Sequence, residues 1–511
     1  MRPLLLLLAL LTAAAAYLWY LGDPVNWPAF VSMSAFYAVI YYVGARAANR
    51  KKAEENDADG LMLAGRNLPV WIAIFTMSAT WVGGGFINGT AEYTATQGLV
   101  WVQAPWGYAL SLVIGGLFFA RTMRRRRYRT MLDPLEERYG KKMTAVLFLP
   151  ALTGELFWTA AILTALGATF STVLGIDLET SILLSATIAI AYTALGGLWA
   201  VALTDVVQIA ILLLGLAIIV PFALEYTGGL GATWAAYQEK FGAAASPFPS
   251  REALGGSYWT WWDYALLLIF GGIPWQVYFQ RVLASQDEKT AVRLSIIAGF
   301  ICVLAAVAPV IIGMVSATMD WSLVEAGGPE NASATLPWVV RYLTNPWVSV
   351  IGLGAVAAAV MSSVDSSVLS ASSMGIWNVY RPLVDPGLPD TKLAKLIQRC
   401  IWIVGVAATL IAFKVSSVYA LWFLCSDFVY CLLFPALVCA LFDPKANSYG
   451  ALAGFLIAAF LRFGGGDDTL GIPAYLPYSD DFPFRTLAMV SGLTAIVVVS
   501  RIFRAGPQDA E

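Results

Sequence analysis

TMSATWVGGGFINGTAE, at residues 76–92, carries the strongest structural signal in the chain, because Gly83, Gly84 and Gly85 interrupt an otherwise apolar run. The run begins near residue 70 and has the length that crosses a bilayer, about 20 residues. Consecutive glycines weaken a helix. Irregular backbone at membrane depth is tolerated only where it is buried in protein or lines a cavity. The stretch therefore predicts a membrane helix that is broken beside a cavity.

A second stretch, FGGIPWQVYFQRVL at residues 270–283, interrupts another apolar run with Gly271, Gly272 and Pro274. Proline lacks the N–H that would continue the helix, so this run is also predicted to break.

The two broken runs occupy corresponding positions, because each opens a group of five apolar runs, at 70–224 and at 259–442. Such a pair is typical of an inverted five-plus-five repeat, in which substrate and ions bind near the midplane. The alternative is that the glycines only let helices pack closely. Two breaks in corresponding positions favour the transporter.

The composition independently predicts an all-α polytopic membrane protein. Of 511 residues, 59% are hydrophobic and 13% are charged, whereas soluble domains usually carry about 25% charged residues. Thirteen runs reach membrane-spanning length. They lie at 28–47, 70–92, 98–120, 145–175, 179–199, 202–224, 259–282, 291–317, 348–378, 396–414, 418–442, 448–463 and 485–504.

The opening run at 3–22 has two interpretations. A short basic start before a leucine run and small residues is typical of a signal peptide. The aromatic residues Tyr17, Trp19 and Tyr20 suit a membrane interface, so an additional helix is favoured.

The positive charges predict the orientation, because cytoplasmic loops carry an excess of Lys and Arg. They follow the run at 28–47, form RTMRRRRYR at 121–129 and precede the run at 396–414. We therefore expect a cell-membrane protein with a cytoplasmic C-terminus. The two longer loops, at 225–258 and 318–346, fall on the external side and are expected to be ordered caps over a transport pathway.

The predicted organisation has seven parts. They are an N-terminal helix or signal-like segment (1–24), a peripheral helix and cytoplasmic loop (25–69), the first repeat (70–224), an external loop (225–258), the second repeat (259–442), two peripheral helices (443–504) and a short tail (505–511).

The same sequence argues against several other classes of protein. The net charge is −2 and no basic domain is present, so no nucleic-acid partner is expected. The chain has no histidine and no GxxxxGK[ST] loop, which argues against an enzyme and against nucleotide binding. The cysteines lack CxxC spacing and are interpreted as buried free thiols. They are Cys302, Cys400, Cys425, Cys431 and Cys439.

Acidic residues inside the spans are candidates for ion binding, since buried charges in a membrane are costly. The four are Glu155, Asp205, Asp365 and Asp427. Ser362, Asp365 and Ser366 share one helix face, and three oxygens with one negative charge suit Na⁺. Back-bonded serines are the alternative. The alternative interpretation of Asp205 is a helix cap. The alternative interpretation of Glu155 and Asp427 is a structural hydrogen-bond hub.

Aromatic residues near the breaks are the second candidate site. Trp81 directly precedes the first glycine break and Trp275 directly follows Pro274, while Tyr108 and Trp158 lie inside the next spans. Several rings around one point attract an organic cation, each contributing roughly 0.5–2 kcal/mol when desolvated. Packing is the simpler interpretation of any single ring.

At these residues the sequence resembles the sodium:solute symporter family and, within it, the high-affinity choline transporters. The similarity runs from about residue 60 to about residue 500. The stretches that carry it are TMSATWVGGGFINGTAE, WGYALSLVIGGLFFA, TMLDPLEERYGKK, PALTGELFWTAAILTALGAT, LTDVVQ, GGIPWQVYFQRVL and GAVAAAVMSSVDSSVLSASSM. The resemblance implies a LeuT-type fold with thirteen family helices and Na⁺-driven choline uptake.

The resemblance also implies roles for individual residues. Trp81, Tyr108, Trp158 and Trp275 stand at the positions of the family's aromatic cage. By resemblance, the ligands of the family's common sodium site are Ala79, Val82, Ala359, Ser362 and Ser363. A second sodium site, found in several members, implies Ser362, Asp365 and Ser366, with Asp205 nearby.

The expected function is thus symport of choline with Na⁺ and without a cofactor, with the lipid bilayer as the surrounding partner. Two departures limit the resemblance: the run at 3–22 is additional, and the tail is shorter than that of the animal members. Chloride dependence, known in those members, is left open because the sequence offers no recognisable chloride site. The alternatives are a betaine, carnitine or other small solute, and a membrane sensor that acts with a separate partner.

Overall fold

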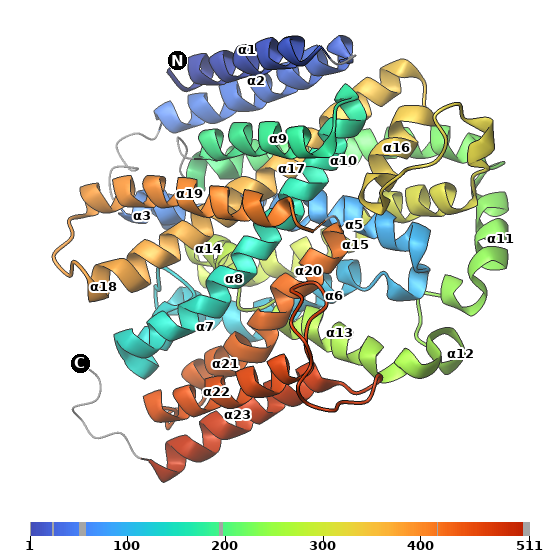
Figure 1. Cartoon of the computed structure of the whole chain (residues 1–511). Helices are drawn as coiled ribbons and strands as arrows, with labels where there is room; N and C mark the ends of the chain where they lie inside the picture. The colour runs from blue at the N-terminus through green and yellow to red at the C-terminus, as the bar shows by residue number, and fades with distance from the viewer. Residues whose placement is uncertain (1, 23–24, 51–57, 194–197, 416, 504–511) are drawn as a thin grey trace.

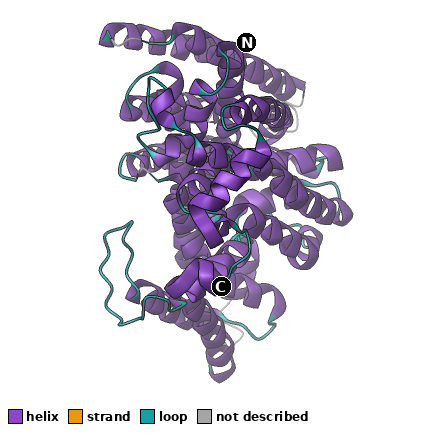
Figure 2. Ribbon diagram, turned by 90° about the vertical axis from the view of Figure 1, so that its right-hand side faces the viewer, coloured by secondary structure: helices purple, strands orange, loops and turns teal. Residues whose placement is uncertain are grey.

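The computed structural model describes residues 2–22, 25–50, 58–193, 198–415 and 417–503, and this part of the chain is helical (Figure 1, Figure 2). Two isolated bridges, Leu68 with Ser285 and Asp467 with Ile472, are the only β-type pairings there. The all-α prediction is therefore confirmed. The predicted tail at 505–511 lies outside the described residues.

Within the described residues, nine helices have the length and apolar character to cross a membrane, or ten with the bent pair described next. They are Leu99–Arg125, Asp133–Leu174, Val201–Glu225, Arg251–Ala284, Glu288–Thr318, Pro346–Leu383, Asp390–Ala412, Val418–Phe442 and Phe484–Ile502. Four shorter apolar helices, Leu8–Tyr20, Trp27–Ile40, Leu178–Ala191 and Ser448–Gly464, fall below that length. A multi-pass membrane protein is confirmed at this level, whereas thirteen spans are not.

The first break separates α4 (Val70–Trp81) from α5 (Gly84–Thr96), which are bent by 48°. Val82 and Gly83 lie between them, and Gly83 has extended backbone (φ −96°, ψ −170°). A Cβ atom at Gly83 would overlap the Oγ of Ser363 in α17 (Pro346–Met374). Glycine is therefore required for α17 to approach the break.

The second break separates α13 (Tyr258–Gly271) from α14 (Gln276–Ala284). A Cβ atom at Gly271 would lie 2.7 Å from the carbonyl oxygen of Ser426, and one at Gly272 would lie 2.6 Å from Ser111 Oγ. Both distances are too short for a real side chain, so neighbouring helices pack directly on the glycine backbone at this break as well.

The two broken helices are joined at one end. The N–H of Leu68, just before α4, donates to the carbonyl oxygen of Ala284 at the end of α14 (3.0 Å). The N–H of Gln286 donates back to Leu68 (3.3 Å). These two hydrogen bonds hold together segments that are more than 200 residues apart, at the ends of α4 and α14 that lie away from the breaks.

Long helices surround the breaks. Helix α8 (Asp133–Leu174) packs against α17 and against α20 (Val418–Phe428), and α6 (Ala104–Ile114) packs against α13. The remaining larger helices are α9 (Leu178–Thr193), α10 (Leu198–Glu225), α15 (Glu288–Thr318), α19 (Asp390–Ala412) and α21 (Phe434–Phe442).

Peripheral helices lie at opposite sides of this core (Figure 1). The pair α1 (Arg2–Leu21) and α2 (Trp27–Arg50) lies on one side, and the pair α22 (Ser448–Gly464) and α23 (Phe484–Ile502) lies on the other. The loops predicted as caps contain α11 (Leu230–Phe241), α12 (Arg251–Leu254) and α16 (Thr335–Tyr342), so both are structured.

Candidate functional site

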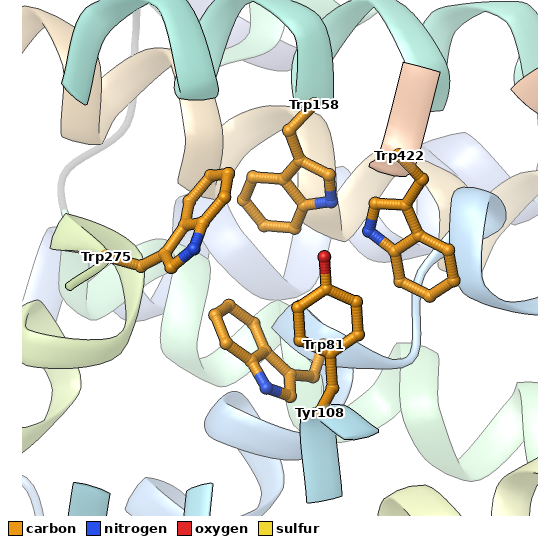
Figure 3. Close-up of a pocket in the computed structure, with 5 residues that line it drawn as sticks. All are labelled: Trp81, Tyr108, Trp158, Trp275 and Trp422. Atoms are coloured by element: carbon orange, nitrogen blue, oxygen red, sulfur yellow. The ribbon is translucent and has the colours of Figure 1, made fainter. Parts of the chain in front are cut away.

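Five aromatic side chains surround a cavity of about 240 Å³ at the centre of the helices (Figure 3). They are Trp81, Tyr108, Trp158, Trp275 and Trp422, and all are buried. We call this group the aromatic cage.

The two helix breaks position the central rings of the cage. Trp81 is the last residue of α4 and Trp275 immediately precedes α14. The ring centroid of Trp81 lies 5.9 Å from Tyr108, 5.9 Å from Trp158 and 6.5 Å from Trp275, and each of these three pairs is edge to face. The four rings predicted from the sequence therefore meet at one point.

Trp422 of α20 is the cage residue that the sequence analysis missed. Its ring lies 5.0 Å from that of Tyr108. No glycine break adjoins it, so the criterion that selected Trp81 and Trp275 could not find it. The available signal was its place inside an apolar run, three residues after Tyr419, whose ring it contacts at 5.8 Å.

The cage offers ring faces and a few polar atoms, without a charged side chain among its five members. The indole nitrogen of Trp275 donates to the carbonyl oxygen of Gly271 (2.6 Å), whereas the buried indole nitrogen of Trp81 has no partner among the described residues. Tyr108 hydrogen-bonds through its hydroxyl to Ser426 Oγ. Desolvated ring faces attract cations, so the cage is suited to a small organic cation.

Hydroxyl and carbonyl oxygens meet where α17 touches the first break. Ser362 Oγ donates to the carbonyl oxygen of Ala79 and Ser363 Oγ donates to that of Thr80, both at 3.1 Å. Neutral oxygens from two helices are suitable ligands for a hard monovalent cation such as Na⁺. Val82 lies in the break beside them, and the side chain of Ala359 in α17 lies outside the described residues.

The second predicted sodium set is only partly brought together. Asp205 Oδ2 accepts a hydrogen bond from Thr76 Oγ1 (2.5 Å) and lies 3.5 Å from Arg281 Nη2. Arg281 Nη2 also donates to Ser366 Oγ (2.5 Å), so Asp205 and Ser366 share one guanidinium group. Asp205 lies inside α10, which shows that its interpretation as a helix cap is wrong.

Asp365 faces a different partner. Its Oδ1 accepts a hydrogen bond from Thr193 Oγ1 of α9 (2.6 Å), and its Oδ2 is buried without a partner among the described residues. Among the described residues, the hydrogen bonds of Ser366 go to Arg281, Thr80 and the carbonyl oxygen of Ser362, and not to this carboxylate.

The other two intramembrane acids make structural contacts. Glu155 Oε2 accepts a hydrogen bond from Ser367 Oγ (3.2 Å), which links α8 to α17. Asp427 is held by Arg462 Nε (2.7 Å) and Arg485 Nε (2.8 Å), which come from the peripheral helices α22 and α23. Asp427 therefore fits the interpretation as a hydrogen-bond hub, whereas Glu155 Oε1 is buried without a partner among the described residues, so the role of Glu155 stays open.

Comparisons with known proteins match this arrangement. The profile of the sodium:solute symporter family matches residues 61–458. High-affinity choline transporter 1 of Drosophila melanogaster is 44% identical over 495 residues, covering 93% of this chain and 78% of that protein. The human protein of the same name is also 44% identical over 495 residues, covering 92% and 84%.

A solved Na⁺-coupled sialic acid symporter has a similar fold, with a TM-score of 0.77 over 94% of this chain and 98% of that one, at 19% identity. The family profile spans well over half of the chain and agrees with the helical architecture. This chain belongs to the sodium:solute symporter family.

Proposed function

We propose that this protein is a secondary active symporter that imports choline with Na⁺ and holds the quaternary ammonium group in the aromatic cage. The observation that carries the proposal is the meeting of five uncharged aromatic side chains around one cavity, two of which, Trp81 and Trp275, adjoin the helix breaks. Two relatives at 44% identity are named choline transporters, which supports choline over other organic cations.

The coupling ion is assigned to the first break. Ala79, Val82 and Ala359 would supply carbonyl oxygens, and Ser362 and Ser363 would supply hydroxyl oxygens. The hydrogen bonds from Ser362 and Ser363 to α4 support this assignment, because these oxygens already lie at contact distance. Na⁺ bound there would hold α4 against α17 and so fix Trp81 in the cage.

Transport then follows from a five-plus-five arrangement. The groups 70–224 and 259–442 would form two inverted repeats that expose the cage to each side of the membrane in turn. The contact between Trp81 and Trp275, which adjoin the two breaks and lie 6.5 Å apart between ring centroids, supports this proposal. The proposed orientation places the C-terminus in the cytoplasm, with Arg121, Arg124 and Arg125 on the inner side.

The test is uptake of radiolabelled choline into proteoliposomes under an inward Na⁺ gradient, with an equal K⁺ gradient as the control. We expect uptake with Na⁺ and none with K⁺. Na⁺-dependent uptake of betaine or carnitine, without uptake of choline, would support the symport mechanism and show that choline is not the substrate. Failure with every quaternary amine would overturn the proposed function and favour a sensor.

A further inference from the structure

A second cavity, of about 550 Å³, shares helix α20 with the aromatic cage. Four half-buried aromatic residues line it: Tyr93, Trp101, Tyr264 and Phe423. It adjoins a wider cavity of about 1,200 Å³ beneath the loop between α22 and α23, because Tyr264, Asp467, Thr469 and Arg485 line both. The second cavity therefore lies next to the wider one on the side of this loop.

A chain of ring contacts connects the second cavity to the cage. Tyr264 lies 4.6 Å from Phe423, and Phe423 lies 4.9 Å from Tyr419, between ring centroids. Tyr419 in turn lies 5.8 Å from Trp422 of the cage. Phe423 and Trp422 are consecutive residues, so one turn of α20 lines both cavities.

The charged groups beside the second cavity carry an excess of negative charge. Asp427 forms ion pairs with both Arg462 and Arg485. Each of these arginines also has a second acidic partner. Arg462 lies 2.6 Å from Asp467, and Arg485 lies 3.7 Å from Asp263. Three carboxylates therefore share two guanidinium groups, which leaves a formal charge of −1. Burial strengthens the attraction of such a charge for a cation.

The side chains that line the wider cavity also carry an excess of negative charge. Asp467, Asp468 and Asp480 line it, and Arg485 is the only base among its described lining residues. A cleft lined by one sign of charge concentrates ions of the opposite sign. Half-buried rings beside such a charge are a suitable surface for an organic cation.

We infer that the second cavity is a separate, weaker binding site for the same class of ligand, a small quaternary ammonium ion, which occupies it before reaching the cage. This inference rests on the proposed choline function. The rings of Tyr93 and Phe423 bind the cation, since the guanidinium group of Arg485 already lies over the ring of Tyr264 (4.5 Å), and the excess carboxylate charge attracts it.

Thr469 allows a direct test, because its exposed side chain lines both cavities and lies in a turn outside the ion-pair network. Three variants at this position differ mainly in charge: Thr469→Lys, Thr469→Gln and Thr469→Glu. We expect Thr469→Lys to raise the apparent choline constant about 3- to 10-fold relative to Thr469→Gln, which is the uncharged reference of similar size, and Thr469→Glu to lower it. The differences should shrink at high ionic strength.

A second measurement separates the two sites. Trp81→Ala combined with Trp275→Ala removes two rings of the cage and leaves the second cavity intact. Equilibrium binding of tritiated choline to this purified double variant should keep one weak site, which Thr469→Lys should weaken further. Choline constants within twofold of one another for all three Thr469 variants, or no weak site in the double variant, would overturn the inference. If the unmodified protein neither binds nor transports choline, the proposed function itself fails.

Discussion

Trp275 shows how much of the cage depends on single residues. Its ring lies against both Trp158 (5.5 Å) and Trp81 (6.5 Å), so it closes one side of the cavity. We expect Trp275→Ala to raise the apparent choline constant about tenfold, since a desolvated cation–π contact contributes up to roughly 2 kcal/mol.

The control for this prediction is Trp275→Phe, which keeps an aromatic face and should lose much less affinity. Uptake kinetics in proteoliposomes measure both variants. An unchanged choline constant in Trp275→Ala would show that the cation binds elsewhere.

Tyr108 carries the only oxygen among the five side chains that line the cage, and its hydroxyl points between Trp158 and Trp422 (Figure 3). Indole nitrogens only donate hydrogen bonds, whereas a phenol also accepts them. Tyr108 is therefore positioned to recognise the hydroxyl group of choline. Ethyltrimethylammonium is choline without that hydroxyl group and serves as the matched ligand.

We expect the unmodified protein to bind choline about 5- to 10-fold more tightly than ethyltrimethylammonium, the value of one hydrogen bond. In Tyr108→Phe this preference should disappear while ethyltrimethylammonium binds as before. Competition against labelled choline measures the ratio. A preference that survives in Tyr108→Phe would assign hydroxyl recognition to another group.

The sequence revealed four of the five cage residues for a physical reason. A tryptophan beside irregular backbone in mid-membrane has no interface to anchor, so Trp81 and Trp275 were recognisable locally. Trp422 lies in a regular helix and becomes a cage residue only through its packing against Tyr108. The bond between Arg281 and Ser366 was likewise invisible, because it joins residues 85 positions apart.

At the scale of elements, the first break depends on the size of one residue. A Cβ atom at Gly83 would overlap Ser363 Oγ, whereas a Cβ atom at Gly85 would find its nearest neighbour, Val418 Cγ1, at 3.8 Å. We expect Gly83→Ala to abolish most Na⁺-dependent uptake, because α17, which carries Ser362 and Ser363, must move away from the proposed sodium ligands on α4.

Gly85→Ala is the matched control, and it should retain uptake close to that of the unmodified protein. Surface expression of both variants is measured in parallel, so that loss of transport is distinguished from loss of folding. Equal activity in the two variants would contradict a role for close contact at Gly83.

Helix α15 begins at an N-cap that can be tested by pH. The N–H of Thr290 donates to the carboxylate of Asp287 (2.7 Å), and this hydrogen bond holds the pKa of Asp287 below its usual range. A lowered pKa means that the cap stabilises the fold at neutral pH and is lost as the pH falls through that pKa.

We expect Asp287→Ala to destabilise α15 by about 1 kcal/mol and to lower the midpoint of thermal unfolding in detergent at pH 7. Asp287→Asn keeps a capping oxygen and should lose less. The difference between Asp287→Ala and the unmodified protein should diminish below about pH 4. A difference that is independent of pH would contradict the assignment.

The sequence predicted the positions of the broken helices, whereas the number of spans stays a prediction. Glycine runs and a proline act locally, so the breaks could be located before the packing was known. Span length depends on where a helix ends in three dimensions. The run at 448–463 forms a 17-residue helix, α22, that packs along α23 instead of standing alone.

At the scale of the whole molecule, the proposed cycle moves at least two positive charges, choline and Na⁺, in one direction. Each charge that crosses the full field gains roughly 2.3 kcal/mol per 100 mV. We therefore expect an inside-negative potential, imposed with K⁺ and valinomycin, to accelerate choline uptake into proteoliposomes. Uptake that is indifferent to the potential would contradict net inward movement of positive charge.

The peripheral helices α22 and α23 are bonded to the core through ion pairs. Arg462 of α22 and Arg485 of α23 both bind Asp427 of α20, the helix that carries Trp422. The joined ends of the two broken helices, at Leu68 and Ala284, provide a second link between distant segments. Neither link could be predicted from the sequence, because each depends on the three-dimensional arrangement.

Trp422 and Phe423 adjoin in the chain but line different cavities. Consecutive helical residues point about 100° apart, so a rotation of α20 that reshapes one cavity also reshapes the other. A movement of α20 during transport is therefore expected to open or close both cavities together, although their lining residues belong to separate sites.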